Sequence, residues 1–361
     1  MKALLLLLIA LWMILAIVSS EDEQREFKAW IDRIGRKSTR SAGMRVHHHL
    51  IESLVEAERN QSVIVVARDG FGNFSSIAEA IDSIPEQNQQ RVIVRIKAGV
   101  YREKIAIPKS KPFVTLQGDG SSLTIITWNS TASDRNGTNL LKTYNSATIS
   151  INSRFFIAKN ITFQNEAIAH IHGETGKQAV ALRISADMAA FYDCNFHGGQ
   201  DTLYDHKGRH YFKRCFVQGS VDFIFGYGRS LYKDCHLYSI ANKTGAITAQ
   251  KRTIRNMNSG FSFVNCSITG SGRIYLGRAW GDRSRVVYSY TYMDALIAPQ
   301  GWQNWNHPER NRTVFFAQYE CSGPGAKTSQ RVAWARTLTF EEAQPFLGTD
   351  FIHGETWLLS T

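Results

Sequence analysis

Short apolar runs, separated by turn-forming residues, dominate the chain from about residue 91 onward. The intervals between them are rich in Gly, Asn, Ser and Asp, and no helical period links one run to the next. This pattern predicts a fold built mainly from short β-strands. The predicted strands occupy residues 91–96, 113–117, 124–127, 147–151, 155–157, 160–163, 285–293 and 312–318.

An internal repeat lies between these strands, from residue 178 to residue 270. Aromatic or apolar residues lead into a cysteine, apolar residues follow, and a small residue ends the run, as around Cys194, Cys215 and Cys235. A weaker copy surrounds Cys266, so the gaps between the cysteines are 21, 20 and 31 residues. Repeats of about 20 residues without helices are typical of a parallel β-solenoid, in which each repeat forms one coil and equivalent residues stack.

Two short helices are predicted at the ends of the solenoid. Ser76 and Glu79 have the spacing of a capping box, and apolar positions within residues 77–84 fall on one helical face. We expect this helix to cover the open N-terminal end of the coils, whose core would otherwise meet water. A C-terminal helical segment is predicted to begin at residues 339–344.

The chain before the solenoid divides into two parts. Residues 4–18 form an apolar run that is short for a membrane span, and an acidic stretch follows Ser20. We therefore expect residues 1–20 to be a cleaved signal peptide rather than a retained anchor, with no stable membrane association. Residues 21–62 are polar and irregular, and residues 63–361 are predicted to form one domain.

Composition and charge favour a secreted protein that binds acidic polymers. The chain is 43% hydrophobic and 20% charged, and its net charge is +11. Outside the cell, a basic protein attracts acidic polysaccharides or anionic membranes rather than nucleic acid. Asn-X-Ser/Thr sequons are permissive for a glycoprotein, although Asn160 and Asn265 lie in strand-like runs and should stay unmodified. Five cysteines leave at least one thiol free, and bridges between coils remain possible.

No cofactor or metal is indicated. The chain has no zinc-binding spacing, no P-loop and no dinucleotide-binding glycine pattern. The run of three histidines at residues 47–49 has no cysteine or carboxylate partner nearby, so we do not expect it to bind a metal.

Two aspartates share one position in the repeat. Asp201 and Asp222 each follow the cysteine of their repeat by seven residues, so they should stack on adjacent coils about 4.8 Å apart. Gln178 and Gln200, 22 residues apart, should stack in the same way. Two carboxylates at this distance do not both ionise easily, which prepares one as an acid and the other as a base. A purely structural ladder of side chains at a coil corner fits the spacing equally well.

Five short motifs follow one another along the chain: Gly99-Val100-Tyr101-Arg102-Glu103, Gln178-Ala179-Val180-Ala181-Leu182, Gly199-Gln200-Asp201-Thr202-Leu203-Tyr204, Asp222-Phe223-Ile224-Phe225-Gly226 and Leu276-Gly277-Arg278-Ala279-Trp280. Together they resemble the pectin methylesterases, and Gly208-Arg209-His210-Tyr211-Phe212 follows the plant pattern of that family. One pentapeptide alone would be weak evidence, but five in the family's order are strong. The resemblance covers roughly residues 65–361 and implies a right-handed parallel β-helix that hydrolyses methyl esters of galacturonate in cell-wall pectin and releases methanol.

The resemblance implies a role for each polar residue of these motifs. Asp222 would be the nucleophile that forms an acyl-enzyme, and Asp201 would first protonate methanol and then activate water. Gln178 and Gln200 would donate hydrogen bonds to the oxyanion. Arg278 would hold the carboxylate of Asp222 in its ionised form, although it could instead bind a carboxylate of the substrate.

Aromatic residues near these motifs resemble the family's sugar-stacking positions. Trp280, Trp302, Tyr204 and Phe225 are the candidates, and Phe225 could equally face the core. Tyr101 and Glu103 are expected to be structural. The histidines at residues 170, 172 and 197 are expected to be loop residues rather than catalytic bases.

Two rival functions and two departures from the family remain. The carboxylate pair would also suit a pectin-cleaving glycosidase or lyase, and a basic cleft would suit a non-catalytic binding module.

Many plant relatives carry a long inhibitor-like pro-region, for which residues 21–62 leave no room. Many also have proline where this chain has Ala279, a change expected to loosen the loop that presents Arg278 and Trp280. A proteinaceous inhibitor is an implied partner, and the chain is expected to be monomeric.

Overall fold

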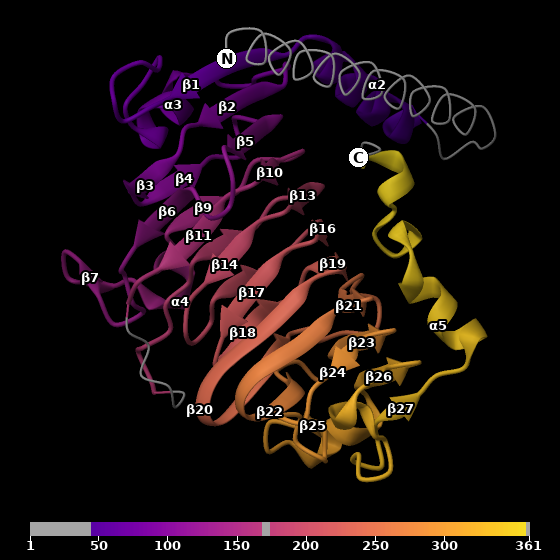
Figure 1. Ribbon diagram of the computed structural model, residues 1–361. Helices are drawn as coiled ribbons and strands as arrows, with labels where there is room; N and C mark the ends of the chain where they lie inside the picture. The colour runs from indigo at the N-terminus through magenta and orange to yellow at the C-terminus, as the bar shows by residue number, and fades with distance from the viewer. Residues whose placement is uncertain (1–44, 168–173, 359–361) are drawn as a thin grey trace, which may run out of the picture.

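Two large parallel sheets wind around one elongated core in the computed structural model, which describes residues 45–167 and 174–358 (Figure 1). Within these residues, eleven strands pair in the first sheet. In order across the sheet they are β1 (Ser62–Val66), β2 (Val92–Ile96), β5 (Val114–Gly118), β10 (Ile157–Lys159), β13 (Ala189–Tyr192), β16 (Arg209–Lys213), β19 (Arg229–Lys233), β21 (Gly260–Val264), β23 (Arg285–Ser289), β26 (Phe315–Tyr319) and β27 (Arg336–Thr337).

The second sheet folds into two further faces of the solenoid. One face consists of β3 (Gly99–Arg102), β6 (Thr124–Trp128), β11 (Thr162–Asn165), β14 (Asn195–His197) and β17 (Phe216–Gly219). The other consists of β4 (Ile105–Ile107), β9 (Ile149–Ile151), β12 (Leu182–Ile184), β15 (Leu203–Asp205) and β18 (Val221–Gly226). The long strands β20 (His236–Gln250) and β22 (Ser267–Ala279) run through both faces, and β24 (Tyr292–Met293) and β25 (Trp302–Gln303) pair with β22. The predicted right-handed parallel β-helix is confirmed.

Stacked aromatic rings fill the core of the repeat region. Phe191 lies 4.7 Å from Phe212, Phe212 lies 4.5 Å from Tyr232, and Tyr232 lies 4.6 Å from Phe263, measured between ring centroids. Each ring comes from the same position of the next coil, because β13, β16, β19 and β21 pair in register. Offset stacking adds roughly 0.5–1.5 kcal/mol per pair to the burial of apolar area.

The repeat cysteines mark a tight corner of each coil. The residue just before each cysteine has a positive φ, for example 53° at Asp193, 52° at Arg214 and 54° at Asn265. All five cysteines are unpaired. Cys321 shares the corner position, because its Sγ donates to the carbonyl two residues earlier as the other four do. A small side chain suits this corner because it must turn inward beside the bend.

The corner side chains are also linked from coil to coil. Arg214 donates two hydrogen bonds to Asp193, at 2.7 and 2.6 Å, and Asn265 donates to Asp234 at 2.7 Å. Asn160 and Asn265 therefore lie in corners, not in strands, and Asn265 is exposed. Their expected place in strands, from which we predicted that both sequons stay unglycosylated, was therefore wrong.

The helix α3 (Ile77–Ser83) covers the N-terminal end of the solenoid, as predicted. Ser76 caps it by accepting the amide of Glu79 at 3.2 Å. The second cap comes from Glu103, whose carboxylate accepts the amides of Ile77 and Ala78 at 3.0 and 2.9 Å. A carboxylate here also faces the positive end of the helix dipole. Glu103 is thus structural, as expected, and replaces Glu79 in the expected capping box.

The helix α2 (Arg45–Arg59) contradicts the prediction of an irregular segment up to residue 62. Its residues Leu54 and Ala57 are buried with the C-terminal residues Trp357 and Leu358, which run back along the solenoid toward α2 (Figure 1). Tertiary burial stabilises this helix, so its own sequence gave a weak signal.

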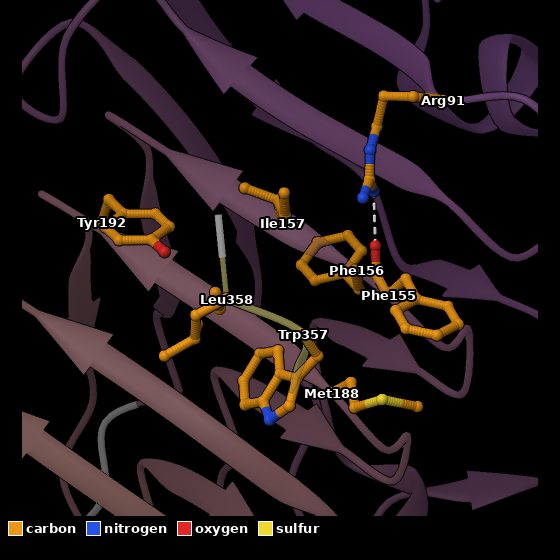
Figure 2. A pocket seen from close by; sticks show the side chains of 9 residues that line it. Arg91, Phe155, Phe156, Ile157, Met188, Tyr192, Trp357 and Leu358 are labelled. Carbon is orange, nitrogen blue, oxygen red and sulfur yellow. Dashed lines mark hydrogen bonds between the residues drawn. The ribbon is translucent and has the colours of Figure 1, made fainter. Parts of the chain in front are cut away.

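A buried ion pair and a small pocket lie where these two ends of the chain meet. Arg91 donates to Glu58 of α2 and to the carbonyl of Phe155. Figure 2 shows Arg91 pointing toward Phe155, with Trp357 and Leu358 on the opposite side of the pocket.

The remaining elements are short. The helix α5 (Phe340–Leu347) confirms the predicted C-terminal helical segment, and Thr339 caps it in a complete capping box with Glu342. Within the described residues, no helix is long and apolar enough to cross a membrane. The other elements are α4 (Lys142–Asn145), the hairpin of β7 (Arg135–Asn136) and β8 (Asn139–Leu140), and the 3₁₀ helices η1 (Pro308–Arg312), η2 (Pro324–Ala326), η3 (Thr349–Ile352) and η4 (Gly354–Thr356).

Truncation of the central ring of the stack should be costly. Phe212→Ala removes a fully buried ring between two stacked neighbours and should lower the free energy of unfolding by about 3–5 kcal/mol. Urea unfolding followed by circular dichroism measures the loss. Phe71→Ala is the matched control because Phe71 is 92% exposed, and equal losses for the two variants would contradict the stacked core.

Candidate active site

A pocket of about 470 Å³ opens over the strands β15, β18, β20 and β22. Its floor follows one row of paired residues, one from each strand: Tyr204, Phe225, Ala249 and Arg278. The pocket is lined by Lys142, Thr143, Tyr144, Gln178, Gln200, Asp201, Tyr204, Asp222, Phe225, Ala249, Lys251, Arg278, Trp280 and Trp305.

Asp201 and Asp222 occupy the same position on adjacent coils, as the repeat predicts. Gln200 bridges to Val221, and the amide of Asp201 donates to the carbonyl of Val221 at 3.1 Å. Both aspartates have positive φ, 62° and 49°, a conformation that aspartate tolerates better than most residues. Such backbone outliers gather at functional sites, where the surrounding structure holds them.

Burial raises the pKa of Asp201 well above its usual value. The negative charge of Asp222 raises this pKa further, while Arg278 opposes the shift. The stacked spacing predicts a raised pKa from the neighbouring carboxylate, but loss of water contact contributes more to the raised pKa of Asp201. A protonated carboxyl group in the pocket can act as an acid.

Arg278 holds the carboxylate of Asp222 with two hydrogen bonds. Its Nε donates to Oδ1 at 2.8 Å and its Nη2 donates to Oδ2. The guanidinium lies 4.0 Å from the ring centroid of Trp305, which fixes it from another side. Burial raises the pKa of Asp222, and Arg278 lowers it in opposition. Two donors of the Arg278 guanidinium are thus engaged by Asp222.

Gln178 and Gln200 both reach the pocket beside the two aspartates. The side-chain oxygen of Gln178 accepts the amide of Gly176 at 3.0 Å, which leaves its NH₂ group as a donor. Gln200 is 6% exposed, and its side-chain oxygen has no hydrogen-bond partner among the described residues. Neutral donors of this kind suit an oxyanion, because they offer hydrogen bonds without a charge that could be lost.

Three of the four predicted aromatic residues line the pocket. Tyr204 and Phe225 stack with their centroids 4.2 Å apart, and Phe225 lies 6.2 Å from Trp280. Trp302 does not reach the pocket: it is 2% exposed and stacks on Phe316 at 4.5 Å inside the core. Its prediction as a sugar-binding residue was therefore wrong.

Trp305 takes the place in the pocket that was assigned to Trp302. The two tryptophans are three residues apart in a segment that leaves β25 without a regular repeat, so the sequence offered no means to choose between them. Tyr144, Lys142 and Lys251 were also missed. The first two belong to α4, a short helix whose sequence has no amphipathic period.

The comparisons with known proteins agree with this geometry. The model of the family described as Pectinesterase matches residues 63–355. The chain belongs to the pectinesterase family. It is 44% identical to Pectinesterase QRT1 of Arabidopsis thaliana over 351 residues, 94% of this chain and 92% of that protein. Probable pectinesterase 8 of the same plant is 46% identical over 305 residues, 82% of this chain and 76% of that protein.

Solved structures of pectinesterases have the same fold. The pectin methylesterase from carrot superposes with a TM-score of 0.77 and 38% identity, covering 82% of this chain and 94% of that one. The enzyme from Aspergillus niger gives a TM-score of 0.70 at 29% identity, with 82% and 94% covered. The resemblance predicted from the five motifs is confirmed, and this pectinesterase is a carboxylic ester hydrolase.

Tyr101 and His197 of the pectinesterase lie away from the pocket. Tyr101 is 2% exposed and donates to the carbonyl of Lys97 at 2.9 Å, so it is structural as expected. His197 lies in the strand β14, so its prediction as a loop residue was wrong. It packs edge-to-face with Phe216 outside the pocket, and burial lowers its pKa. The other two histidines of that prediction lie outside the described residues.

The loop that follows Arg278 is well anchored despite the absence of proline. The carbonyl of Ala279 accepts a hydrogen bond from Arg310 at 2.7 Å, and the amide of Gly281 donates to the carbonyl of Gln250 at 3.1 Å. The expected loosening is therefore not seen. No cluster of His, Cys, Asp or Glu side chains in the described part of the chain could hold a metal ion.

The two tryptophans should respond differently to truncation. Trp305→Ala removes a pocket wall and the ring that supports Arg278, so kcat/KM for methylated pectin should fall about tenfold or more, with little loss of stability. Trp302→Ala should instead lower the free energy of unfolding by about 3–5 kcal/mol. Methanol release and urea unfolding, measured for both variants, test which tryptophan lines the pocket. A loss of activity for Trp302→Ala and a loss of stability for Trp305→Ala would refute the placement of Trp305 in the pocket.

Proposed function

We propose that this pectinesterase removes methyl esters from the galacturonate units of pectin, with Asp222 as the nucleophile and Asp201 as the acid and base. One observation supports the assignment above all others. The carboxylate that Arg278 holds in a two-pronged grip lies in register with a second carboxyl whose pKa burial raises, and both face one open pocket. One group is thereby aimed as an anion while its neighbour keeps a proton.

The first half of the reaction forms an acyl-enzyme. An oxygen of Asp222 attacks the ester carbonyl carbon, and the carbonyl electron pair moves to oxygen. Gln178 and Gln200 donate hydrogen bonds to the resulting oxyanion. As the tetrahedral intermediate collapses, the bond to the methoxy oxygen breaks and Asp201 gives its proton to that oxygen. Methanol leaves, and galacturonate is joined to Asp222 as an anhydride.

The second half uses the same residues in reverse order. Asp201, now an anion, removes a proton from water as the water oxygen attacks the acyl carbon. The two glutamines again donate to the oxyanion, and collapse breaks the bond to Asp222. The products are a free galacturonate carboxyl and the original enzyme with Asp201 protonated. Arg278 accommodates both states of Asp222, because a guanidinium stays charged throughout.

The setting that we propose is the plant cell wall. A basic chain behind an apolar leader is suited to secretion and to binding an acidic polymer. A related pectin methylesterase, 27% identical, has been solved in complex with a hexasaccharide, which supports an extended oligosaccharide as the ligand here. A proteinaceous inhibitor as a partner, and action as a monomer, remain part of this proposal.

Removal of the nucleophile tests the proposal directly. Asp222→Asn keeps the shape of the side chain but not its charge, and should lower methanol release from methylated pectin by roughly a thousandfold or more. Retention on a pectin column should persist, because the pocket walls remain. Methanol release that survives the substitution would refute the role of Asp222. New reducing ends or unsaturated products from the unmodified chain would instead indicate a glycosidase or a lyase.

The pH dependence of kcat/KM should show two limbs. Activity requires ionised Asp222, so it should rise as pH increases through the pKa of Asp222, which is raised above 3.8. Activity also requires protonated Asp201, so it should fall as pH increases through that residue's still higher pKa. Arg278→Met removes the cation that lowers the pKa of Asp222, so the acid limb should move to higher pH. An unmoved acid limb would show that Asp222 does not govern it.

A further inference from the structure

The row of paired residues in the pocket floor ends at Arg278 on one side and continues past Tyr204 to Arg183 on the other, and each arginine contacts an aromatic residue of the pocket wall. Arg278 stacks on Trp305 at one end, with 4.0 Å from Cζ to the ring centroid. At the other end, Arg183 pairs with Tyr204 across the strands and lies 3.7 Å from the ring centroid of Tyr144. Tyr144 lines the pocket and is 41% exposed, and Arg183 is one of the residues that hold its ring, together with Tyr204 and His206.

Arg183, beside Tyr144 and Tyr204, has no acidic partner among the described residues. It is 4% exposed, and no carboxylate in the described residues pairs with it. Its Nη1 donates to Ser185 at 2.6 Å and to Asn152 at 3.3 Å, while its buried Nε has no partner in the described chain. Burial lowers the pKa of Arg183. A buried guanidinium that forms no ion pair is costly, so a function beyond stability is expected of it.

A chain of hydrogen bonds continues from Arg183 behind the pocket wall. Ser185 Oγ lies 2.8 Å from Nδ1 of His206, and Nε2 of His206 lies 2.8 Å from the hydroxyl of Tyr227. Arginine only donates, so the Ser185 oxygen accepts from it and the serine proton is free to reach Nδ1. Nε2 then carries the proton of a neutral imidazole and donates to Tyr227. In this tautomer the Ser185 hydroxyl donates to His206, whereas in the other tautomer the Ser185 oxygen would accept from both Arg183 and His206.

The imidazole at the centre of this chain touches both tyrosines of the wall. The ring of His206 packs edge-on against Tyr144 at 5.5 Å and against Tyr204 at 4.9 Å, between centroids. Tyr204 in turn stacks on Phe225 above the pocket floor. A change in the hydrogen bonds of His206 therefore reaches the surface that faces the substrate.

We propose that Arg183, Ser185, His206 and Tyr227 form a positioning relay that holds Tyr144 and Tyr204 as the wall of the substrate cleft, and that protonation of His206 releases it. This inference rests on the proposed function, since it concerns the binding of the same polysaccharide. The four residues act through the two tyrosines and do not touch the reacting ester.

The charges around His206 make this relay sensitive to acid. Burial first, and then the positive charges of Arg183 and Lys207, lower the pKa of His206 to about 4. Protonation would reverse the bond to Ser185 and place a second cation beside Arg183. The groups that face His206 are Arg183 from β12, Asp205 and Lys207 on either side in the chain, His210 from β16, and the phenols of Tyr144, Tyr204 and Tyr227. Among these, Asp205 alone favours the protonated form.

Binding measurements can separate this relay from catalysis. In the Asp222→Asn background, calorimetry with a fully methyl-esterified oligogalacturonide avoids titration of both the nucleophile and the ligand. Affinity should fall about tenfold as pH decreases from 6.5 to below 4, with a midpoint near the pKa of His206. Adding His206→Gln, which can accept and donate without titrating, should make the affinity nearly independent of pH. His197→Gln is the matched control, a half-buried histidine outside the pocket, and should retain the pH dependence.

A double-mutant cycle tests whether Arg183 acts through Tyr144. Arg183→Met should raise KM about tenfold while kcat changes much less, and Tyr144→Ala should do the same. The double variant should be no worse than either single one, because both remove the same wall. Circular dichroism checks that each variant folds, and Arg183→Lys, which keeps the cation, should restore part of the loss in KM.

Three results would overturn the relay. They are additive effects of Arg183→Met and Tyr144→Ala, a loss confined to kcat, and a pH dependence that persists after His206→Gln. If the unmodified chain released no methanol, the proposed function would fail instead, and the binding data in the Asp222→Asn background would still decide the relay.

Discussion

The register of backbone hydrogen bonds between coils is the constraint on which the rest of the molecule depends. It stacks Phe191, Phe212 and Tyr232 inside, and on the outside it sets Asp201 beside Asp222. A slip of one residue would turn every side chain of a strand to the opposite face. The core therefore does more than stabilise the fold: its close packing fixes the spacing of the two pocket aspartates to one coil.

Burial of Asp201 and Asp222 sets the pKa values of the pocket, and cations lower the free-energy cost of burying the negative charge. Desolvation raises the pKa of both carboxyl groups, and without Arg278 the anion of Asp222 would be costly to hold. Cations also contact the aromatic walls of the pocket. Arg278 stacks on Trp305, and Lys251 lies 4.0 Å from the ring centroid of Trp280. Arg278 and Lys251 therefore serve twice: each brings positive charge to the pocket, and each holds an aromatic ring of its wall in place.

The fold was predictable from the sequence where a pattern is local or repeats, as at the capped helices α3 and α5 and in the coils, and was missed where distant contacts decide. The 21-residue interval predicted the coils and the partnership of Asp201 with Asp222, since the period itself encodes the register. The choice between Trp302 and Trp305 depends on how an irregular segment turns after β25, which no local pattern records. The helix α2 was missed because its stability comes from contacts with residues 300 positions away. The sequence likewise could not show that burial raises the pKa of Asp201 more than the charge of Asp222 does, because burial depends on the tertiary structure.

The backbone at the two aspartates explains how a regular solenoid can turn carboxyl groups toward a pocket. A strand that alternates strictly would send one of two successive residues outward, yet Phe223 and Ile224 both lie in the core. The positive φ of Asp222 and the register shift that follows it rotate the chain, so that the carboxylate faces the pocket before the core resumes. Because neighbouring coils pair on both sides, their hydrogen bonds can hold this strained turn in place. The regularity of the fold is thus what permits a local departure from it at the point where chemistry is needed.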